Sequence, residues 1–388
     1  MSDLIIAGLV LAIWLYLVFA HGGFWRGREA EQFPIPEPVT NEDWPPVVAV
    51  IPARNEIETL PRCLASLLAQ TYPGDFSIVV VDDQSDDGTG DLARNLADGA
   101  SRNVIVLSAP SRPPAWTGKV WAQHTGVTHI EQTSKPAKYL LLTDADITYE
   151  PQSLIGLVRA AEKQRAVLVS LMAKLNCTSV AEHALVPAFI YFFQMLYPFQ
   201  FANQPRHPLA AAAGGCMLID RAALSRAGGL ETIRSALIDD CTLAGVMKRQ
   251  GPIWLGLAKT VRSIREYPGI ADIRAMVSRS AYAQLRYSPL LLVGTTFGLI
   301  LVFLAAPILI FAGSWPSKVL ATCAYFLMFW SYQPTLRYYS RHWAWGLLVP
   351  LVTVLYLQFT LDSAYQHWRG RGGMWKGRAQ AAQGNDGI

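Results

Sequence analysis

Two aspartates stand one residue apart at the end of an apolar run. The run YLLL (139–142) continues through Thr143 to Asp144 and Asp146, which flank Ala145. Carboxylates this close repel each other unless a positive group lies nearby. In a strand, residues i and i+2 point to the same side, so a strand that continued through Asp146 would aim both carboxylates at one point. Hard oxygen ligands of this kind select Mg²⁺ or Mn²⁺, which commonly binds substrate phosphates as well.

The alternative interpretation is a polar turn, because aspartate is common at strand ends and a DxD triplet alone is a weak signal. A second acidic stretch favours the functional interpretation. VVVDDQSDDGT (79–89) places four aspartates directly after another apolar run. Such a concentration of carboxylates is costly unless the groups are solvated or liganded. Two acidic motifs with the same context indicate a site for a metal ion and a phosphorylated ligand.

The elements that must position these motifs alternate along the chain. We expect strands at 47–53, 76–83, 103–107 and 139–146, and helices at 56–70, 88–96, 119–130 and 151–163. This alternation is typical of an α/β fold with a mostly parallel sheet and helices on both faces, and continuous apolar strands fit a sheet buried on both sides. Ligands of such sheets bind beyond the carboxyl ends of the strands, where both acidic motifs fall.

Five motifs in a fixed order resemble those of the family 2 inverting glycosyltransferases, which have the GT-A fold. They are PARNE (52–56), VVVDDQSDDGT (79–89), LLLTDAD (140–146), GGCMLIDR (214–221) and LIDDCTLA (237–244). The resemblance covers about residues 46–290, and the ordered set is far more specific than any single motif. The chain looks most like the membrane-bound, lipid-directed branch, which includes ceramide glucosyltransferase and, closer still, the hopene-associated glycosyltransferases.

On the donor side, the resemblance implies a role for each matching residue. Glu56 falls in the loop expected near the nucleoside, and Asp83 matches the aspartate that contacts the nucleotide base. Asp144 and Asp146 match the metal and diphosphate motif, with Asp146 as the direct metal ligand. Lys119 resembles a basic residue between the two acidic motifs and is expected to neutralise phosphate. The alternative for Lys119 is a solvated helix start.

On the acceptor side, Asp239-Asp240 stands where the family has Glu-Asp. The resemblance implies that Asp240 deprotonates the acceptor hydroxyl, while Asp239 departs from the usual Glu. Gly215 is expected near the acceptor. The Q/R-x-x-R-W signature of processive relatives is reduced to Ala-Gln-Leu-Arg-Tyr, in which Arg286 is expected to bind diphosphate and Tyr287 to stack near the acceptor. This departure disfavours a long polysaccharide product.

Long uncharged runs indicate a membrane protein, since 52% of the residues are hydrophobic and only 16% are charged. Residues 4–20, 289–313 and 343–361 each approach the length of about 20 apolar residues that crosses a bilayer, and 318–334 is a weaker candidate. The first run does not read as a signal peptide, because no Lys or Arg precedes it and no small-residue cleavage site follows. Two arginines shortly after it place the following domain in the cytoplasm by the positive-inside rule.

Two further segments are expected at the membrane surface. The aromatic-rich stretch 185–202 contains two prolines and suits an interfacial helix, with a buried core helix as the alternative. The stretch 265–288 carries four arginines, Arg265 among them, and is expected to be a second surface helix that faces lipid headgroups. If all C-terminal runs crossed, the basic tail at 367–378 would end outside, against the positive-inside rule. One of these runs is therefore expected to be re-entrant or interfacial.

The chain accordingly divides into six expected parts. They are a transmembrane anchor (1–28), a proline-rich linker (29–46), a catalytic domain (47–264), an interfacial segment (265–288), transmembrane helices (289–364) and a basic tail (365–388). Five scattered cysteines without a CxxC pair favour free thiols in a reducing compartment. The mild net charge of +4, with basic residues near the apolar runs, indicates contact with lipid headgroups and not with nucleic acid.

The combined expectation is a multi-pass enzyme of the inner membrane whose catalytic domain faces the cytoplasm. It would transfer a sugar from a nucleotide sugar, a UDP-sugar in the first instance, to a lipid such as a hopanoid; the hopanoid follows from the resemblance alone. Two alternatives stay open, namely a polyprenyl-phosphate glycosyltransferase, whose acceptor needs no strong base, and a catalytically inactive sugar-nucleotide-binding scaffold. A transporter is disfavoured because the apolar runs lack internal charge.

Overall fold

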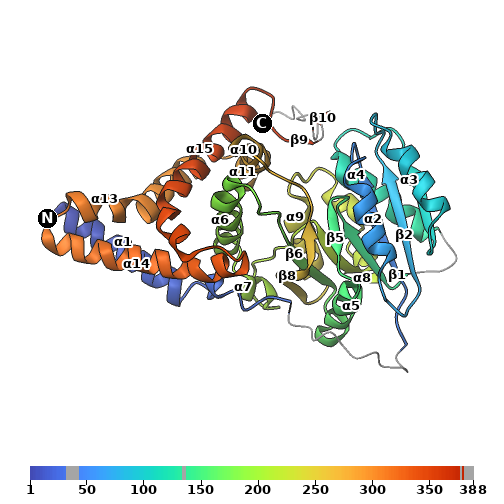
Figure 1. The fold of residues 1–388 in the computed structure, drawn as a ribbon, viewed down its shortest axis with the longest axis horizontal. Coiled ribbons are helices and arrows are strands. Elements are labelled where there is room, and N and C mark those ends of the chain that lie inside the picture. Colours follow the sequence, from blue (N-terminus) through green and yellow to red (C-terminus); the bar gives the residue numbers. More distant parts are fainter. Residues whose placement is uncertain (32–42, 133–136, 376–377, 380–388) are drawn as a thin grey trace. The chain divides into compact units, whose positions relative to one another are not determined.

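The computed structural model describes residues 1–31, 43–132, 137–375 and 378–379. The chain forms two compact units (Figure 1). We call the unit made of Met1–Arg28, Cys177–Gln200 and Glu266–Gly373 the helical unit, and the unit made of Glu29–Asn176, Phe201–Arg265 and Met374–Ile388 the sheet unit. Most of the predicted linker and the end of the predicted basic tail lie outside the described residues, and the six predicted domain boundaries stay predictions.

The sheet unit contains one eight-stranded sheet in the order β3-β2-β1-β4-β7-β6-β8-β5. Its strands are β1 (Val47–Ala53), β2 (Phe76–Asp82), β3 (Val104–Ser108), β4 (Tyr139–Thr143), β5 (Ile147–Tyr149), β6 (Leu168–Lys174), β7 (Cys216–Asp220) and β8 (Ile253–Ser263). β1 pairs in parallel with β2 and β4, β2 with β3, and β6 with β8. β7 runs antiparallel between β4 and β6, and β5 is antiparallel to β8.

Helices cover both faces of this sheet (Figure 1). They are α2 (Leu60–Leu68), α3 (Thr89–Asp98), α4 (Gly118–Glu131), α5 (Ser153–Gln164), α8 (Arg221–Arg226) and α9 (Asp239–Lys248). Strand β1 shows why two faces must be covered, since Ile51 packs in a cluster with α2 and α5 while Val50 packs in another with α4 and α9. The predicted α/β fold with a mostly parallel sheet buried on both sides is confirmed.

The end of β4 differs from the prediction. The strand stops at Thr143, and residues 144–146 turn the chain into β5. The turn forms because β5 leaves the neighbourhood of β4 and pairs antiparallel with β8, with Ile147 opposite Ser263. Asp144 and Asp146 therefore do not project from one strand face, and that expectation is wrong. Strands β6, β7 and β8 were not predicted.

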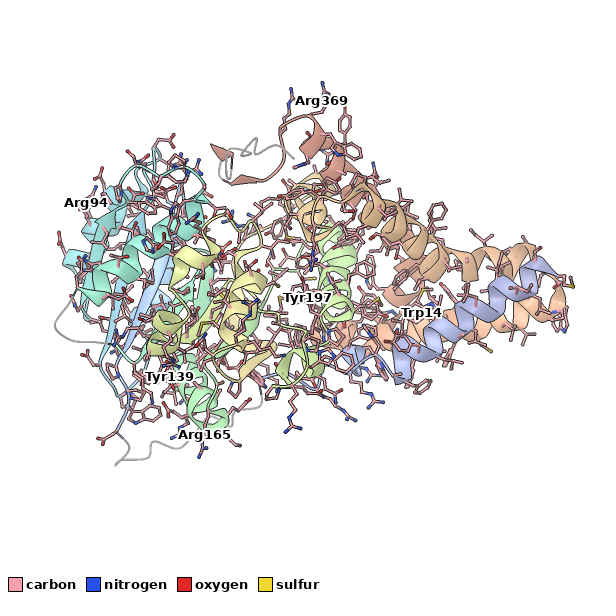
Figure 2. The ribbon with its side chains drawn as sticks, turned by 180° about the vertical axis from the view of Figure 1, so that it is seen from behind. Trp14, Arg94, Tyr139, Arg165, Tyr197 and Arg369 are labelled. Carbon is pink, nitrogen blue, oxygen red and sulfur yellow. The ribbon has the colours of Figure 1, made fainter. Side chains whose placement is uncertain are left out.

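The helical unit is built from long apolar helices and a buried aromatic core. Its elements are α1 (Ser2–Phe19), a short 3₁₀ turn (Phe24–Arg26), α6 (Val180–Leu196), α10 (Ile270–Ser278), α11 (Ala281–Gln284), α12 (Pro289–Leu299), a π-helical stretch (Ile300–Leu304), α13 (Ala305–Ala312), α14 (Trp315–Tyr338), a second 3₁₀ turn (Trp343–Leu348) and α15 (Val349–Trp368). Trp14 lies among these helices (Figure 2). Its Nε1 donates to the Val302 carbonyl at 2.8 Å, and its ring packs edge-on against Phe303 in the core.

Three stretches of this unit are long and apolar enough to cross a membrane among the residues that the structure describes. They are Ser2–Phe19, Pro289–Ala312 and Trp343–Trp368. Helix α14, the weakest candidate in the sequence, is long enough but is not among them. The structure is thus consistent with membrane association.

The two segments predicted at the membrane surface are each interrupted. The first is broken near Pro198, where α6 ends and a short helix, α7 (Phe199–Asn203), begins. Tyr191 of α6 is buried in the core of the helical unit, and Phe192 packs edge-on against Phe303 and Tyr356. Part of this aromatic stretch therefore serves the protein's own core. The second segment forms α10 and α11 in place of one surface helix.

Candidate active site

The turns that follow β1 and β2 interlock at the carboxyl edge of the sheet. Arg54 Nη1 donates to the carbonyls of Asp83 at 2.5 Å and Gln84 at 2.9 Å. The Glu56 backbone N–H donates to Thr89 Oγ1 at 2.9 Å. Asp83, predicted to contact the nucleotide base, is fully buried behind these turns. The structure brings the first two predicted motifs together, while the contacts predicted for them with the nucleotide stay predictions.

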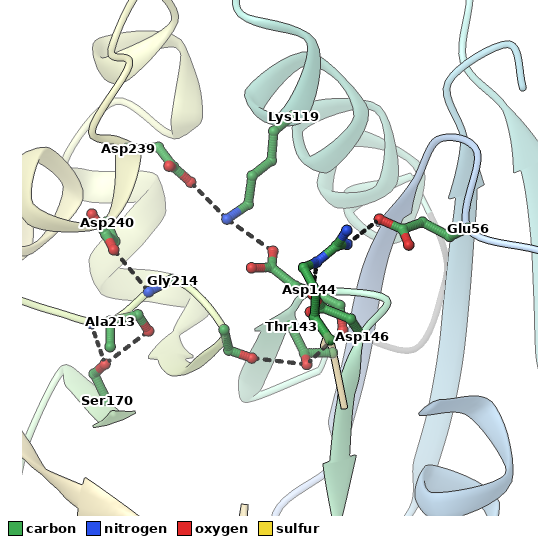
Figure 3. A network of polar contacts seen from close by, with 12 residues as sticks. Glu56, Lys119, Thr143, Asp144, Asp146, Ser170, Ala213, Gly214, Asp239 and Asp240 are labelled. Carbon is green, nitrogen blue, oxygen red and sulfur yellow. Dashed lines mark hydrogen bonds and ion pairs between the residues drawn. The ribbon is translucent and has the colours of Figure 1, made fainter. Parts of the chain in front are cut away.

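Lys119 links the DxD motif (Asp144 and Asp146) to the Asp239-Asp240 pair. Its Nζ lies 2.8 Å from Asp144 Oδ1 and 3.3 Å from Asp239 Oδ2 (Figure 3). The side chain is only 15% exposed, so the alternative of a solvated helix start is wrong. Burial opposes the charge, but the carboxylates of Asp144 and Asp239 raise the pKa of Lys119 above its usual value, which keeps the amine protonated. A permanent positive charge thus lies between the predicted metal motif and the predicted base.

Arg265 holds the other carboxylate of the DxD motif. Its Nε lies 2.6 Å from Asp146 Oδ2, and its Nη2 lies 2.8 Å from Glu56 Oε1. The expectation that Arg265 faces lipid headgroups is therefore wrong. The residue follows β8, and the pairing of β8 with β5 brings it beside Asp146. Sequence reasoning missed this contact, because the partners are far apart in the chain.

Asp240 lies in the first turn of α9 and is held by two backbone donors. Its Oδ2 accepts from the Gly214 N–H at 2.9 Å, and its Oδ1 from the Cys241 N–H at 2.7 Å. Burial and the neighbouring Asp239 carboxylate raise the pKa of Asp240 to about 6, although Lys119 and the two N–H groups oppose the shift. A general base works best with a pKa near the operating pH. The geometry and the charge state both suit proton abstraction.

Hydrogen bonds hold the turn before β7 in place on both sides of Gly214. Ser170 Oγ donates to the Ala213 carbonyl at 3.1 Å and accepts from the Ala213 N–H at 2.8 Å (Figure 3). On the other side, Thr143 Oγ1 donates to the Gly215 carbonyl at 3.0 Å. Gly215 thereby helps to position the site through its backbone, while its predicted contact with the acceptor stays a prediction. Gly214 was missed, although it lies in the same quoted motif.

Gly214→Ala is expected to lower the rate of transfer by about 10- to 100-fold, as small displacements of catalytic groups do. A Cβ at Gly214 would lie 3.0 Å from Lys119 Nζ and 3.3 Å from Asp240 Oδ2, so both groups would have to move. The measurement is the initial rate at saturating donor. Gly245→Ala is the matched control, because Gly245 lies in the same helix as Asp240 and its Cβ would meet nothing within 4 Å. Equal rates for the two variants would contradict the assigned geometry.

The carboxylates at this edge have the chemistry of a Mg²⁺ or Mn²⁺ site. Such ions are usually bound by one or two carboxylates together with substrate phosphates, and Asp144 and Asp146 supply these oxygens. Within the described residues no group of three or more His, Cys, Asp or Glu side chains is arranged to hold a metal ion. The two cations, Lys119 and Arg265, face the carboxylates of Glu56, Asp144, Asp146, Asp239 and Asp240. This acidic surplus would repel a diphosphate unless a cation accompanied it.

Arg286 and Tyr287 belong to the helical unit. The Tyr287 ring stacks on His367 with centroids 4.3 Å apart, and both Arg286 and Tyr287 adopt a left-handed backbone, with φ of 52° and 55°. Their predicted contacts with the diphosphate and the acceptor stay predictions.

Comparisons with known proteins give the family and the fold that this chain resembles. Residues 48–228 match the family model "Glycosyl transferase family 2". The chain is 32% identical over 111 residues to "Glycosyltransferase AglE" of Haloferax volcanii. The aligned stretch covers 28% of this chain and 33% of that protein. It is 30% identical over 101 residues to the "4,4'-diaponeurosporenoate glycosyltransferase" of Staphylococcus haemolyticus, covering 26% and 24% respectively. The chain thus spans about a third or less of the length of these relatives.

Among solved structures, the chain is similar to the mannosyltransferase PcManGT from Pyrobaculum calidifontis in complex with GDP-Man and Mn²⁺. The TM-score is 0.54 at 18% sequence identity, and the match covers 91% of this chain and 99% of that one. At this identity the likeness shows a shared fold. The predicted GT-A fold is confirmed, and residues 48–228 are similar to the family 2 glycosyltransferases.

Proposed function

We propose that the chain is a membrane-bound, inverting glycosyltransferase that moves a sugar from a nucleotide sugar to a lipid hydroxyl. The proposal rests chiefly on Asp240, a half-buried carboxylate whose pKa of about 6 suits a general base. Lys119 joins its neighbour Asp239 to Asp144 of the DxD motif, so the predicted base and the predicted donor site are parts of one network. The family 2 domain match supports the reaction class.

In this mechanism Asp240 takes the proton of the acceptor hydroxyl, and the oxygen attacks the anomeric carbon as the bond to the diphosphate breaks. The N–H groups of Gly214 and Cys241 hold the carboxylate in place. Lys119 places positive charge beside the leaving group. A bound Mg²⁺ or Mn²⁺ held by Asp144 and Asp146 would supply further stabilisation of the diphosphate. One displacement inverts the anomeric configuration without an enzyme nucleophile.

A lipid acceptor is supported by the apolar helices and by one relative whose name gives a lipid-like substrate, diaponeurosporenoate. A hopanoid acceptor and a UDP-sugar donor rest on the family resemblance alone. The raised pKa of Asp240 favours a hydroxyl acceptor over a polyprenyl phosphate, which has no proton that needs a strong base. The complete set of acidic and basic groups likewise favours an enzyme over an inactive scaffold.

Lipid profiling tests this function. The lipids of a deletion strain are compared with those of the same strain carrying the wild-type chain or Asp240→Asn. The wild-type chain is expected to restore one glycosylated lipid and the variant is not. If no lipid differs between the deletion strain and the complemented strain, a lipid acceptor is wrong.

The contacts inside the helical unit also bear on topology. Asp3 Oδ2 accepts from the Ser314 N–H at 2.8 Å and from Ser317 Oγ at 2.9 Å, so the first turn of α1 meets the first turn of α14. Beyond the other end of α1, the rings of Trp25 and Trp330 lie 4.5 Å apart. Helices α1 and α14 therefore run side by side over much of their length, and α14 crosses wherever α1 does.

Helix α15 is connected through α6 to the end of α1 that lies near Trp25. The Tyr356 hydroxyl donates to the Leu185 carbonyl of α6 at 2.8 Å, and α6 itself reaches the end of α1, where Gln194 Nε2 donates to the Phe24 carbonyl at 3.0 Å. We propose that α1, α12–α13 and α14 cross the bilayer while α15 lies at the interface. The basic tail then stays on the side of the catalytic domain, as the positive-inside rule requires.

Reporter fusions test this topology. A fluorescent protein fused at the C-terminus is expected to fluoresce in the cytoplasm, and alkaline phosphatase at the same place to be inactive. Alkaline phosphatase inserted after Gly313 is expected to be active, because the turn between α13 and α14 lies on the opposite side. An active phosphatase at the C-terminus would mean that α15 crosses.

A further inference from the structure

Arg265 pairs with both carboxylates of the expected donor site. These are Asp146, expected to bind the metal ion, and Glu56, expected near the nucleoside. Arg265 bridges Asp146 and Glu56 with contacts of 2.6 Å and 2.8 Å. Neither contact follows from the domain match or from the motifs. A metal ion that binds Asp146 Oδ2 competes with this guanidinium, because the two positive charges repel each other at such distances.

The backbone holds the contact in place. The Ile264 N–H donates to the Asp146 carbonyl at 2.9 Å, which fixes the chain just before Arg265 against the DxD turn. Glu56 is oriented by the Thr59 hydroxyl, which donates to its Oε2 at 2.7 Å. The other carboxylate oxygen of Glu56 therefore faces Arg265 in a preset position. The Arg265 bridge between Asp146 and Glu56 is therefore held in place by the fold of the sheet unit.

Exposure distinguishes Arg265 from the second cation of the site. The Arg265 side chain is 32% exposed, whereas those of its partners Glu56 and Asp146 are 9% and 12% exposed. The Lys119 side chain is only 15% exposed. The guanidinium of Arg265 therefore has a path into solvent, while its carboxylate partners do not move out of the site. Of the two cations, Arg265 is the one that an incoming ion can replace.

We propose that Arg265 is a displaceable counter-ion for the DxD motif. It neutralises Asp146 and Glu56 when no metal is bound and leaves Asp146 when a divalent cation arrives, while Glu56 keeps hold of the guanidinium. Because metal binding competes with this ion pair, the cation binds more weakly on its own than together with the anionic donor. This deepens the proposed function and rests on its metal-dependent donor site.

The test is the affinity of the full-length protein in detergent for Mn²⁺, without donor, followed by the electron paramagnetic resonance signal of the free ion. Arg265→Met is expected to bind Mn²⁺ about tenfold more tightly than wild type, because an opposing positive charge is removed. Arg262→Met is the matched control, since Arg262 lies near the end of β8, three residues before Arg265, and pairs with Glu150 at 3.6 Å on the exposed surface. Its affinity is expected to stay at the wild-type value.

Arg265→Lys keeps the charge but not the two-pronged contact, and is expected to bind Mn²⁺ with an affinity between those of wild type and Arg265→Met. Thermal unfolding checks that each variant is folded. The proposal is overturned if Arg265→Met binds Mn²⁺ no more tightly than wild type, or if no variant binds Mn²⁺. If Arg265→Met does not fold, the test rests on Arg265→Lys. An unchanged Mn²⁺ affinity of Arg265→Lys would then overturn the proposal.

The outcome is separable from the fate of the proposed function. If Arg265→Met binds Mn²⁺ more tightly but the wild-type protein transfers no sugar to lipid, the counter-ion role stands and the proposed function fails. If the wild-type protein transfers sugar in EDTA and binds no Mn²⁺, the function stands and the counter-ion role fails.

Discussion

Asp240→Asn is expected to bind the nucleotide sugar as wild type does and to transfer sugar about 10²- to 10⁴-fold more slowly, the usual contribution of a general base. Asn is nearly isosteric, and its single side-chain oxygen still accepts from the Gly214 or the Cys241 N–H group, which in Asp240 bond to different oxygens, but it takes no proton at neutral pH. Donor affinity is measured by calorimetry and transfer by the rate of product formation. Asp91→Asn, an exposed acid-to-amide change on α3, is the control and is expected to be silent.

The pH profile gives the same prediction an independent readout. Because the pKa of Asp240 is raised to about 6, the carboxylate is protonated and inactive below that pH and ionised above it. Wild-type kcat/KM is therefore expected to rise through pH 6 and to level off toward pH 7, and the residual activity of Asp240→Asn is expected to lack this rise. A loss of less than tenfold in the variant would instead favour a phosphate acceptor.

The first half of the sheet could be predicted because its strands are continuous apolar runs. β1 and β2 were expected within one residue of their observed ends, since Val, Ile and Ala at these positions are buried on both faces. β6 and β8 lack the regular alternation with helices that made the first strands recognisable. The antiparallel β7 enters the sheet between β4 and β6, a topology that no local pattern encodes.

The site residues also differ in how far they could be predicted. Some lie in a recognisable local motif, and others are placed by contacts between distant parts of the chain. Asp144, Asp146 and Asp240 were found because each lies in a motif with its own local pattern. Arg265 was missed because its contacts depend on the β5–β8 register, and its sequence neighbourhood resembles a basic membrane segment. The available signal was an arginine directly after an apolar, β-rich run, at the edge where the acidic motifs were already placed. Residues that neutralise an acidic motif come from distant strand ends as readily as from its own neighbourhood.

Asp146→Ala is expected to remove metal-dependent turnover, with a loss of at least about 10³-fold at a Mn²⁺ concentration that saturates wild type, because metal stabilisation of a leaving group is worth several kcal/mol. The protein is expected to stay folded. Arg265 keeps its contact with Glu56 and reaches solvent, so the substitution leaves no buried charge without a partner. Turnover is measured across a Mn²⁺ titration and in EDTA, alongside thermal unfolding.

Asp86→Ala is the control for Asp146→Ala, because Asp86 is an exposed carboxylate in the neighbouring acidic turn and its loss changes the net charge equally. It is expected to keep the wild-type rate and Mn²⁺ dependence. Unchanged activity in Asp146→Ala, or full wild-type activity in EDTA, would show that Lys119 and Arg265 alone neutralise the diphosphate. That outcome would be compatible with the structure, since both cations already contact carboxylates of the DxD motif. The Mn²⁺ titration therefore decides whether Arg265 gives way to a metal ion or serves in its place.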